Sequence, residues 1–152
     1  MHTKKFNDGI MNIIKMHSYY FYIVQRNTDI SCTCVTHSTS QASPECPKCL
    51  GTGFKITVRK IKGAAQDTML PTTFRSDNFL VARNYFISDK YKMAEDDLII
   101  DKDVIYRVFE AQELISLEGT IPYRKVSSIK KKFDSKVLLK NLQNIIDGGK
   151  NK

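Results

Sequence analysis

DLIIDKDVIYRVFEAQEL, residues 97–114, holds two apolar runs on either side of a Lys-Asp pair. Both runs are rich in β-branched and aromatic residues, which favour strands. Lys102 and Asp103 stand where a tight two-residue hairpin turn is expected. The stretch therefore predicts an antiparallel hairpin, with one strand over residues 97–101 and its partner over residues 104–114.

Four other segments carry strand signals, and they lie on both sides of this hairpin. They are SYYFYIVQRN (18–27), GFKITVRKIKG (53–63), NFLVARNYFIS (78–88) and ISLEGTIPYRKVSSI (115–129). In the second, Phe54, Ile56 and Val58 alternate with polar residues, as on a half-buried strand. In the last, Gly119 marks a turn, and Pro122 indicates an edge strand or a bulge because proline has no N–H to donate. Residues 63–73 are expected to form a connector.

Amphipathic helices are predicted at both ends of the chain. Residues 6–17 place Ile10, Ile13 and Ile14 on one helical face, together with His17. Residues 134–146 carry an apolar stripe and begin with two candidate caps, Asp134 and Ser135. The stripe consists of Leu138, Leu139, Leu142, Ile145 and Ile146.

Closely spaced short strands favour a small antiparallel β-barrel or sandwich, so the predicted class is mainly β (α+β) with short terminal helices. Residues 1–133 are expected to form one barrel-like domain, and residues 134–152 a C-terminal helix and tail. The 152 residues are 41% hydrophobic, which is enough for a core. The most apolar run, YYFYIV, is far too short to span a bilayer, and no signal peptide is apparent. We expect synthesis in a reducing cytoplasm and no membrane partner.

All four cysteines lie in SCTCVTHSTSQASPECPKCLGTG, residues 31–53, as C-x-C, eleven residues, then C-x2-C. This segment is predicted to be an insertion between two strands. CPKCLGTG resembles a zinc knuckle, in which Gly51 and Gly53 permit left-handed backbone angles. Four thiolates suit tetrahedral zinc with no open coordination position, so we expect one structural zinc per chain. The predicted ligands are Cys32, Cys34, Cys46 and Cys49.

Other interpretations of the cysteines stay open at this point. Free thiols are the main alternative, an iron–sulfur centre uses the same ligand type, and His37 is a second-choice ligand. Disulfides are disfavoured in a reducing compartment. A redox C-x-x-C is disfavoured because of Pro44 and Pro47, before and within the second pair, and because two glycines follow it.

Catalytic patterns are nearly absent from the sequence. There are three histidines, and neither a Ser/His/Asp arrangement nor a phosphate-binding glycine loop is apparent. We therefore predict no enzyme activity and no small-molecule substrate. An acidic group around the hairpin is expected to be solvated rather than catalytic. Its members are Glu95, Asp96, Asp97, Asp101 and Asp103.

The formal net charge of +8 favours acidic partners, either nucleic acid or an acidic protein surface. Basic residues gather on two predicted strands and would form one positive face if those strands were neighbours. A phosphate backbone would be attracted to such a face without being read for sequence, and a solvated face is the alternative. The candidates are Lys55, Arg59, Lys60, Lys62, Arg124, Lys125, Lys130, Lys131 and Lys132.

Two stretches together resemble a family. CTC followed by SPECPKCLGTGFKITV is similar to small virion proteins of tailed bacteriophages. DDLIIDKDVIYRVFEAQEL followed by YRKVSSIKK resembles the barrel hairpin of phage head-closure and neck proteins, with Tyr106, Arg107 and Val108 in the place of their Tyr-x-Val element.

The resemblance implies a non-enzymatic virion structural protein located in the neck or tail. Such proteins form homo-oligomeric rings between the portal and the tail, around the DNA channel. The implied partners are further copies of the chain, neighbouring portal, neck and tail proteins, and packaged DNA. The alternative from another class is a small zinc-binding nucleic-acid-binding module.

Overall fold

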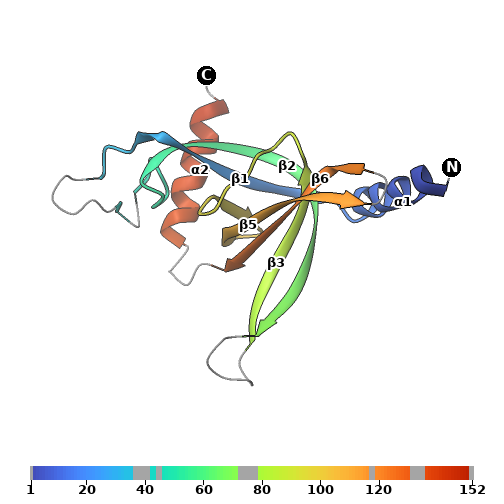
Figure 1. Cartoon of the computed structure of the whole chain (residues 1–152). Helices are drawn as coiled ribbons and strands as arrows, with labels where there is room; N and C mark the ends of the chain where they lie inside the picture. Colours follow the sequence, from blue (N-terminus) through green and yellow to red (C-terminus); the bar gives the residue numbers. More distant parts are fainter. Residues whose placement is uncertain are drawn as a thin grey trace.

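The computed structural model describes residues 2–35, 42–43, 46–71, 79–116, 119–130 and 136–150. These residues form a closed antiparallel barrel with the strand order β1-β2-β3-β6-β5-β4, and a helix at each terminus (Figure 1). The elements are α1 (His2–Met16), β1 (Tyr19–Ser31), β2 (Phe54–Pro71), β3 (Phe79–Ser88), β4 (Leu98–Asp101), β5 (Val104–Ser116), β6 (Gly119–Lys130) and α2 (Lys136–Lys150). The predicted fold class is confirmed.

The β4–β5 hairpin forms where the sequence predicts it. Asp101 pairs with Val104, and the two residues between them, Lys102 and Asp103, have φ angles of 48° and 66°. Two consecutive positive φ angles define the turn whose twist suits a two-residue hairpin.

The run of apolar residues in β4 is buried on both of its faces. Ile99 points into the barrel, where it joins the interior core. Leu98 and Ile100 point outward and pack with Leu138 and Leu142 of α2. The C-terminal helix therefore covers the outer surface of the barrel here, which explains why β4 does not alternate with polar residues. The interior core consists of Phe21, Ile23, Ile61, Tyr85, Ile87, Met93, Ile99, Val108 and Val126.

The connector predicted over residues 63–73 is wrong for its described part, because β2 continues to Pro71. Gly63 is not a turn residue. A Cβ added to it would lie 2.7 Å from the carbonyl oxygen of Phe86 and 3.0 Å from Cζ of Phe21. The glycine is needed where strands and an aromatic ring approach closely, and the strand passes straight through it.

We expect Gly63→Ala to destabilise the protein by about 1–3 kcal/mol or more, because the new methyl group meets backbone that cannot move aside. Denaturant unfolding measures the change. Gly9→Ala is the matched control, since nothing lies within 4 Å of a Cβ added in α1 and alanine favours helix there. Equal effects of the two substitutions would contradict the packing explanation.

Pro122 lies in a bulge, one of the two alternatives predicted for it. Glu113 and Ile115 of β5 pair with Arg124 and Thr120, so residues 121–123 of β6 face a single residue of β5. The edge-strand alternative is wrong, because β6 pairs with β3 as well as with β5.

The acidic group around the hairpin is only partly solvated, which corrects the sequence-based expectation. Asp97 and Asp101 are 2% and 3% exposed. The carboxylate of Asp97 accepts hydrogen bonds from the backbone N–H groups of Arg26 and Ala94 and pairs with the Arg26 guanidinium at 3.2 Å. It thereby ties the segment before β4 to β1.

Asp101 is the centre of a polar network inside the barrel. Its Oδ2 atom accepts a hydrogen bond from the Tyr19 hydroxyl. The same atom accepts from the Tyr85 hydroxyl at 2.8 Å and from Nε of Arg83 at 3.2 Å. The guanidinium of Arg83 also reaches Asp67 at 2.9 Å. The pKa of Tyr19 is raised to about 12, mainly by burial and in addition by hydrogen bonding to Asp101. Burial also raises the pKa of Tyr85.

Stability is therefore expected to fall at alkaline pH. A folded-state pKa of about 12 for Tyr19 lies above the usual value of about 10, so its contribution is complete below pH 10. That contribution is lost as the pH rises from about 10 to about 12. Unfolding titrations at several pH values measure this, and Tyr19→Phe should flatten the decline. An unchanged decline in Tyr19→Phe would show that other groups cause it.

Candidate metal centre

The four cysteines converge at one end of the β1–β2 pair. Cys32 directly follows β1, and Cys49 lies five residues before β2 begins. The pairing of Ser31 with Phe54, and a 2.9 Å hydrogen bond from Cys32 N–H to the Gly53 carbonyl, hold the two ends of the loop together. All four Sγ atoms lie within 4.8 Å of one another.

The sulfur geometry fits a metal ion and not disulfides. The Sγ atoms of Cys32 and Cys46 are 3.8 Å apart, and those of Cys34 and Cys49 are 3.6 Å apart. Four thiolates bound tetrahedrally to zinc at about 2.3 Å lie about 3.8 Å from one another. A disulfide would need about 2.05 Å, and all four cysteines are free. The arrangement is thus compatible with a four-cysteine metal site.

The second cysteine pair has the backbone of a knuckle turn. The N–H of Leu50 donates to the Cys46 carbonyl at 3.0 Å, and Leu50, Gly51 and Gly53 have φ angles of 54°, 83° and 82°. Gly51 and Gly53 therefore adopt the left-handed angles for which glycine is suited. A side chain at position 53 would also approach Cβ of Ala42 to 3.3 Å.

The thiols differ in their environments. Burial raises the pKa of Cys46, but backbone N–H groups of Cys49 and Lys48 donate to its sulfur and bring the pKa down to about 7. Burial raises the pKa of Cys49 to about 12, and burial also raises the pKa of Cys34. Since a metal binds thiolates, these thiols would lose their protons on loading.

The knuckle is attached to the rest of the fold through Leu50. This side chain is 1% exposed and belongs to the cluster that contains Leu138 and Leu142 of α2. The cysteine loop and α2 therefore share one buried apolar cluster with the barrel strands. No sequence pattern predicts that Leu50 is buried in this cluster, because it stands between a cysteine and a glycine in a polar loop.

The four thiols would supply a complete tetrahedral shell for zinc, which leaves no open position for a substrate. A metal bound there would act as a structural cross-link between the end of β1 and the start of β2. His37, the second-choice ligand, lies outside the described residues.

The two strands that carry the predicted basic residues, β2 and β6, are not neighbours in the barrel. β3 lies between β2 and β6 in the barrel. Along β2, Arg59 pairs with Ile23, which points inward, whereas Lys60 and Lys62 hold their ammonium groups over the ring of Tyr20 on the outer side.

The remaining basic candidates are dispersed as well. Lys55 is exposed and lies on the same side of β2 as Arg59. On β6, Arg124 forms a salt bridge with Glu113 at 3.2 Å. Lys125 and Lys130 follow on the same strand. Lys131 and Lys132 lie outside the described residues. The condition for a single positive face across β2 and β6 is therefore not met by the topology.

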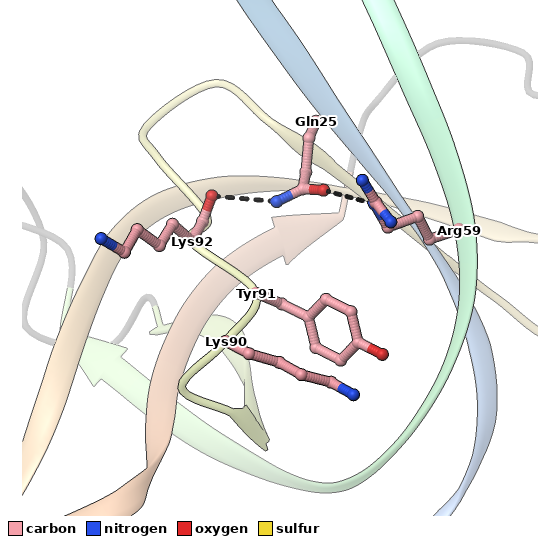
Figure 2. Close-up of a pocket in the computed structure, with 5 residues that line it drawn as sticks. All are labelled: Gln25, Arg59, Lys90, Tyr91 and Lys92. Carbon is pink, nitrogen blue, oxygen red and sulfur yellow. Dashed lines mark hydrogen bonds between the residues drawn. The ribbon is translucent and has the colours of Figure 1, made fainter.

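Arg59 instead shares a pocket with the segment 90–92, which follows β3. The pocket has a volume of about 430 Å³ and is lined by Gln25, Arg59, Lys90, Tyr91 and Lys92 (Figure 2). The pattern Lys-Tyr-Lys was visible in the sequence. Its approach to Arg59 depends on how residues 89–97 cross the barrel, which no local pattern encodes.

None of the described helices has the length and apolar character needed to cross a membrane. Comparison of the chain with protein-family models and with curated proteins finds no match in either set.

Proposed function

We propose that this chain is a structural component of a tailed-phage virion that forms a ring in the neck and joins the portal to the tail around the DNA channel. The proposal begins from the sequence resemblance of the cysteine loop and of the β4–β5 hairpin. In this role the zinc would be structural, and the metal-linked loop would present one fixed shape to an adjacent protein. The role needs no catalytic group.

The observation that carries the proposal is the pair of exposed apolar side chains on α1, Ile13 and Met16. Ile13 and Met16, which lie one turn apart, are 60% and 79% exposed, while Ile14 is buried. The helix extends from the barrel at the end opposite the cysteine loop (Figure 1). Adjacent large apolar side chains on a protruding helix are typical of a contact with another chain. A contact made by one end of a subunit on a different part of the next subunit closes into a ring when the rotation permits.

Native mass spectrometry, with and without a strong chelator, tests the proposal. We expect one metal per chain and a closed oligomer of a single order. Ile13→Lys combined with Met16→Lys should give metal-bound monomers, and Lys15→Gln on the same helix is the control. A metal-bound wild-type chain that stays monomeric at every accessible concentration, and behaves like the double variant, would contradict the ring.

A nucleic-acid-binding module is the second candidate, and the exposed lysines favour it. Lys55, Lys60, Lys62 and Lys130 are exposed within a chain of net charge +8. Such a module would bind free DNA or RNA with an affinity that falls steeply as salt rises. A ring component would bind little free DNA, so a salt titration with a labelled oligonucleotide separates the two functions.

A further inference from the structure

One pocket of the barrel is lined by charged and polar side chains that have no role in the proposed ring. Gln25 of β1, Arg59 of β2 and the segment 90–92 after β3 surround it (Figure 2). Arg59 and Lys90 bring two positive charges to one opening, and Tyr91 lies between them with its hydroxyl pointing to the same side (Figure 2). The ammonium group of Lys92 points away from them, so this residue contributes mainly its backbone.

The arginine is held in place by a side-chain bridge. Gln25 donates from Nε2 to the Lys92 carbonyl at 3.1 Å and accepts from Nε of Arg59 at 3.3 Å. Among the described residues, the hydrogen bond of Arg59 uses only Nε of the guanidinium, and its two outer nitrogens are available to a ligand. A planar, oriented guanidinium suits the two oxygens of a phosphate group.

The other side of the opening is also anchored. Tyr91 packs partly against the interior core, and the Lys90 ammonium lies 5.1 Å from the centre of the tyrosine ring. Within the part of the chain that the structure describes, neither Arg59 nor Lys90 forms a salt bridge with a carboxylate. By contrast, Arg26, Arg83, Arg107 and Arg124 are each paired with an acidic residue.

We infer that this pocket binds a phosphate group, with the outer nitrogens of Arg59 and the Lys90 ammonium as the charged donors and the Tyr91 hydroxyl as a neutral one. Gln25 is a positioning residue, because it acts through Arg59. The phosphate has two possible sources, a nucleic-acid backbone or a free phosphate compound. The inference does not depend on the proposed ring, because it concerns a different surface and a different ligand.

Two-dimensional NMR of the metal-loaded, ¹⁵N-labelled chain provides the test. Inorganic phosphate and pyrophosphate are titrated against chloride at matched ionic strength. We expect saturable shifts of Arg59 Nε–H and of the amides of residues 90–92 with the phosphates, and none with chloride. Arg59→Gln and Lys90→Gln should each weaken binding by about tenfold, since a hydrogen bond to a charged group contributes about that much.

Two controls carry the same loss of charge. Lys92→Gln lies in the same segment but its ammonium points away, and Lys60→Gln lies next to Arg59 on the outer face of β2. Both should bind phosphate within about twofold of the wild type, because surface charges away from the ligand contribute little. Equal weakening in all four variants, or shifts that never saturate, would overturn the site in favour of non-specific charge attraction.

A single-stranded oligonucleotide in a second titration distinguishes the sources. If it shifts the same resonances and pyrophosphate displaces it, the pocket reads a backbone phosphate. If only the small phosphates shift them, the ligand is a free compound. Ring formation is measured separately by mass, so failure of the phosphate site and failure of the ring proposal are distinguishable.

Discussion

Replacing Cys49 with serine is expected to abolish stoichiometric metal binding, to release the cysteine loop and to loosen α2. The Cys49 side chain is fully buried, and its Sγ lies 3.6 Å from that of Cys34. A serine hydroxyl is a poor replacement for a thiolate with metals that prefer sulfur. Metal binding at such sites is worth on the order of 10 kcal/mol, which is far more than one buried leucine contributes.

The effect should reach α2 but not the barrel interior. Leu50 follows Cys49 directly and belongs to the buried cluster that contains Leu138 and Leu142, so a loosened knuckle removes one member of the cluster that holds the helix. None of the interior core residues belongs to the cysteine loop. The barrel should therefore stay folded.

Native mass spectrometry and hydrogen exchange measure these two consequences. In Cys49→Ser, the metal should be absent, and amides in residues 46–54 and 136–150 should exchange faster while those of β1, β3 and β5 stay protected. Lys48→Gln is the control, because this exposed residue lies between Cys46 and Cys49 and offers no sulfur. One metal retained per chain, or an α2 as protected as in the wild type, would contradict the interpretation.

Asp101→Ala is expected to lower the free energy of unfolding by about 3–5 kcal/mol, which is the usual cost of breaking a buried ion pair by removing one partner. The carboxylate is 3% exposed and accepts from Tyr19, Tyr85 and Arg83. Without it, the Arg83 charge and two tyrosine hydroxyls lose their shared acceptor in the barrel interior. Thermal and denaturant unfolding measure the change.

Asp67→Ala is a close control, because Asp67 pairs with the same arginine. The Asp67 side chain is 57% exposed, and exposed pairs contribute about 0–1 kcal/mol. The two variants thus remove the same type of charge from the same partner at different depths. Similar losses from both would show that burial of Asp101 does not determine its contribution.

Patterns within a few residues of each other predicted much of this protein. The Lys102–Asp103 turn follows from two apolar runs separated by two polar residues, and the strands around it follow from β-branched and aromatic content. The four-cysteine cluster follows from spacing, because two close pairs joined by a long polar gap fold back onto each other. In these cases the interactions that decide the structure join residues near in sequence.

Only the tertiary structure decided the features that depend on strands distant in sequence. Gly63 was expected to begin a connector, yet it lies within β2, where Phe86 and Phe21 leave no room for a side chain. Asp101 looked like a solvated hairpin residue, yet barrel closure places it beside Tyr19 and Arg83.

The positions of the pocket residues and of the basic strands also depend on strands that are distant in sequence. Arg59 and Lys90 converge because the segment after β3 crosses the end of the barrel, and β2 and β6 are separated because β3 is inserted between them. Strand order and register are properties of the whole closed sheet. The sequence alone therefore determined the β4–β5 hairpin, most of the strand segments and the clustering of the four cysteines, and the closed barrel determined where β2 ends and which side chains meet.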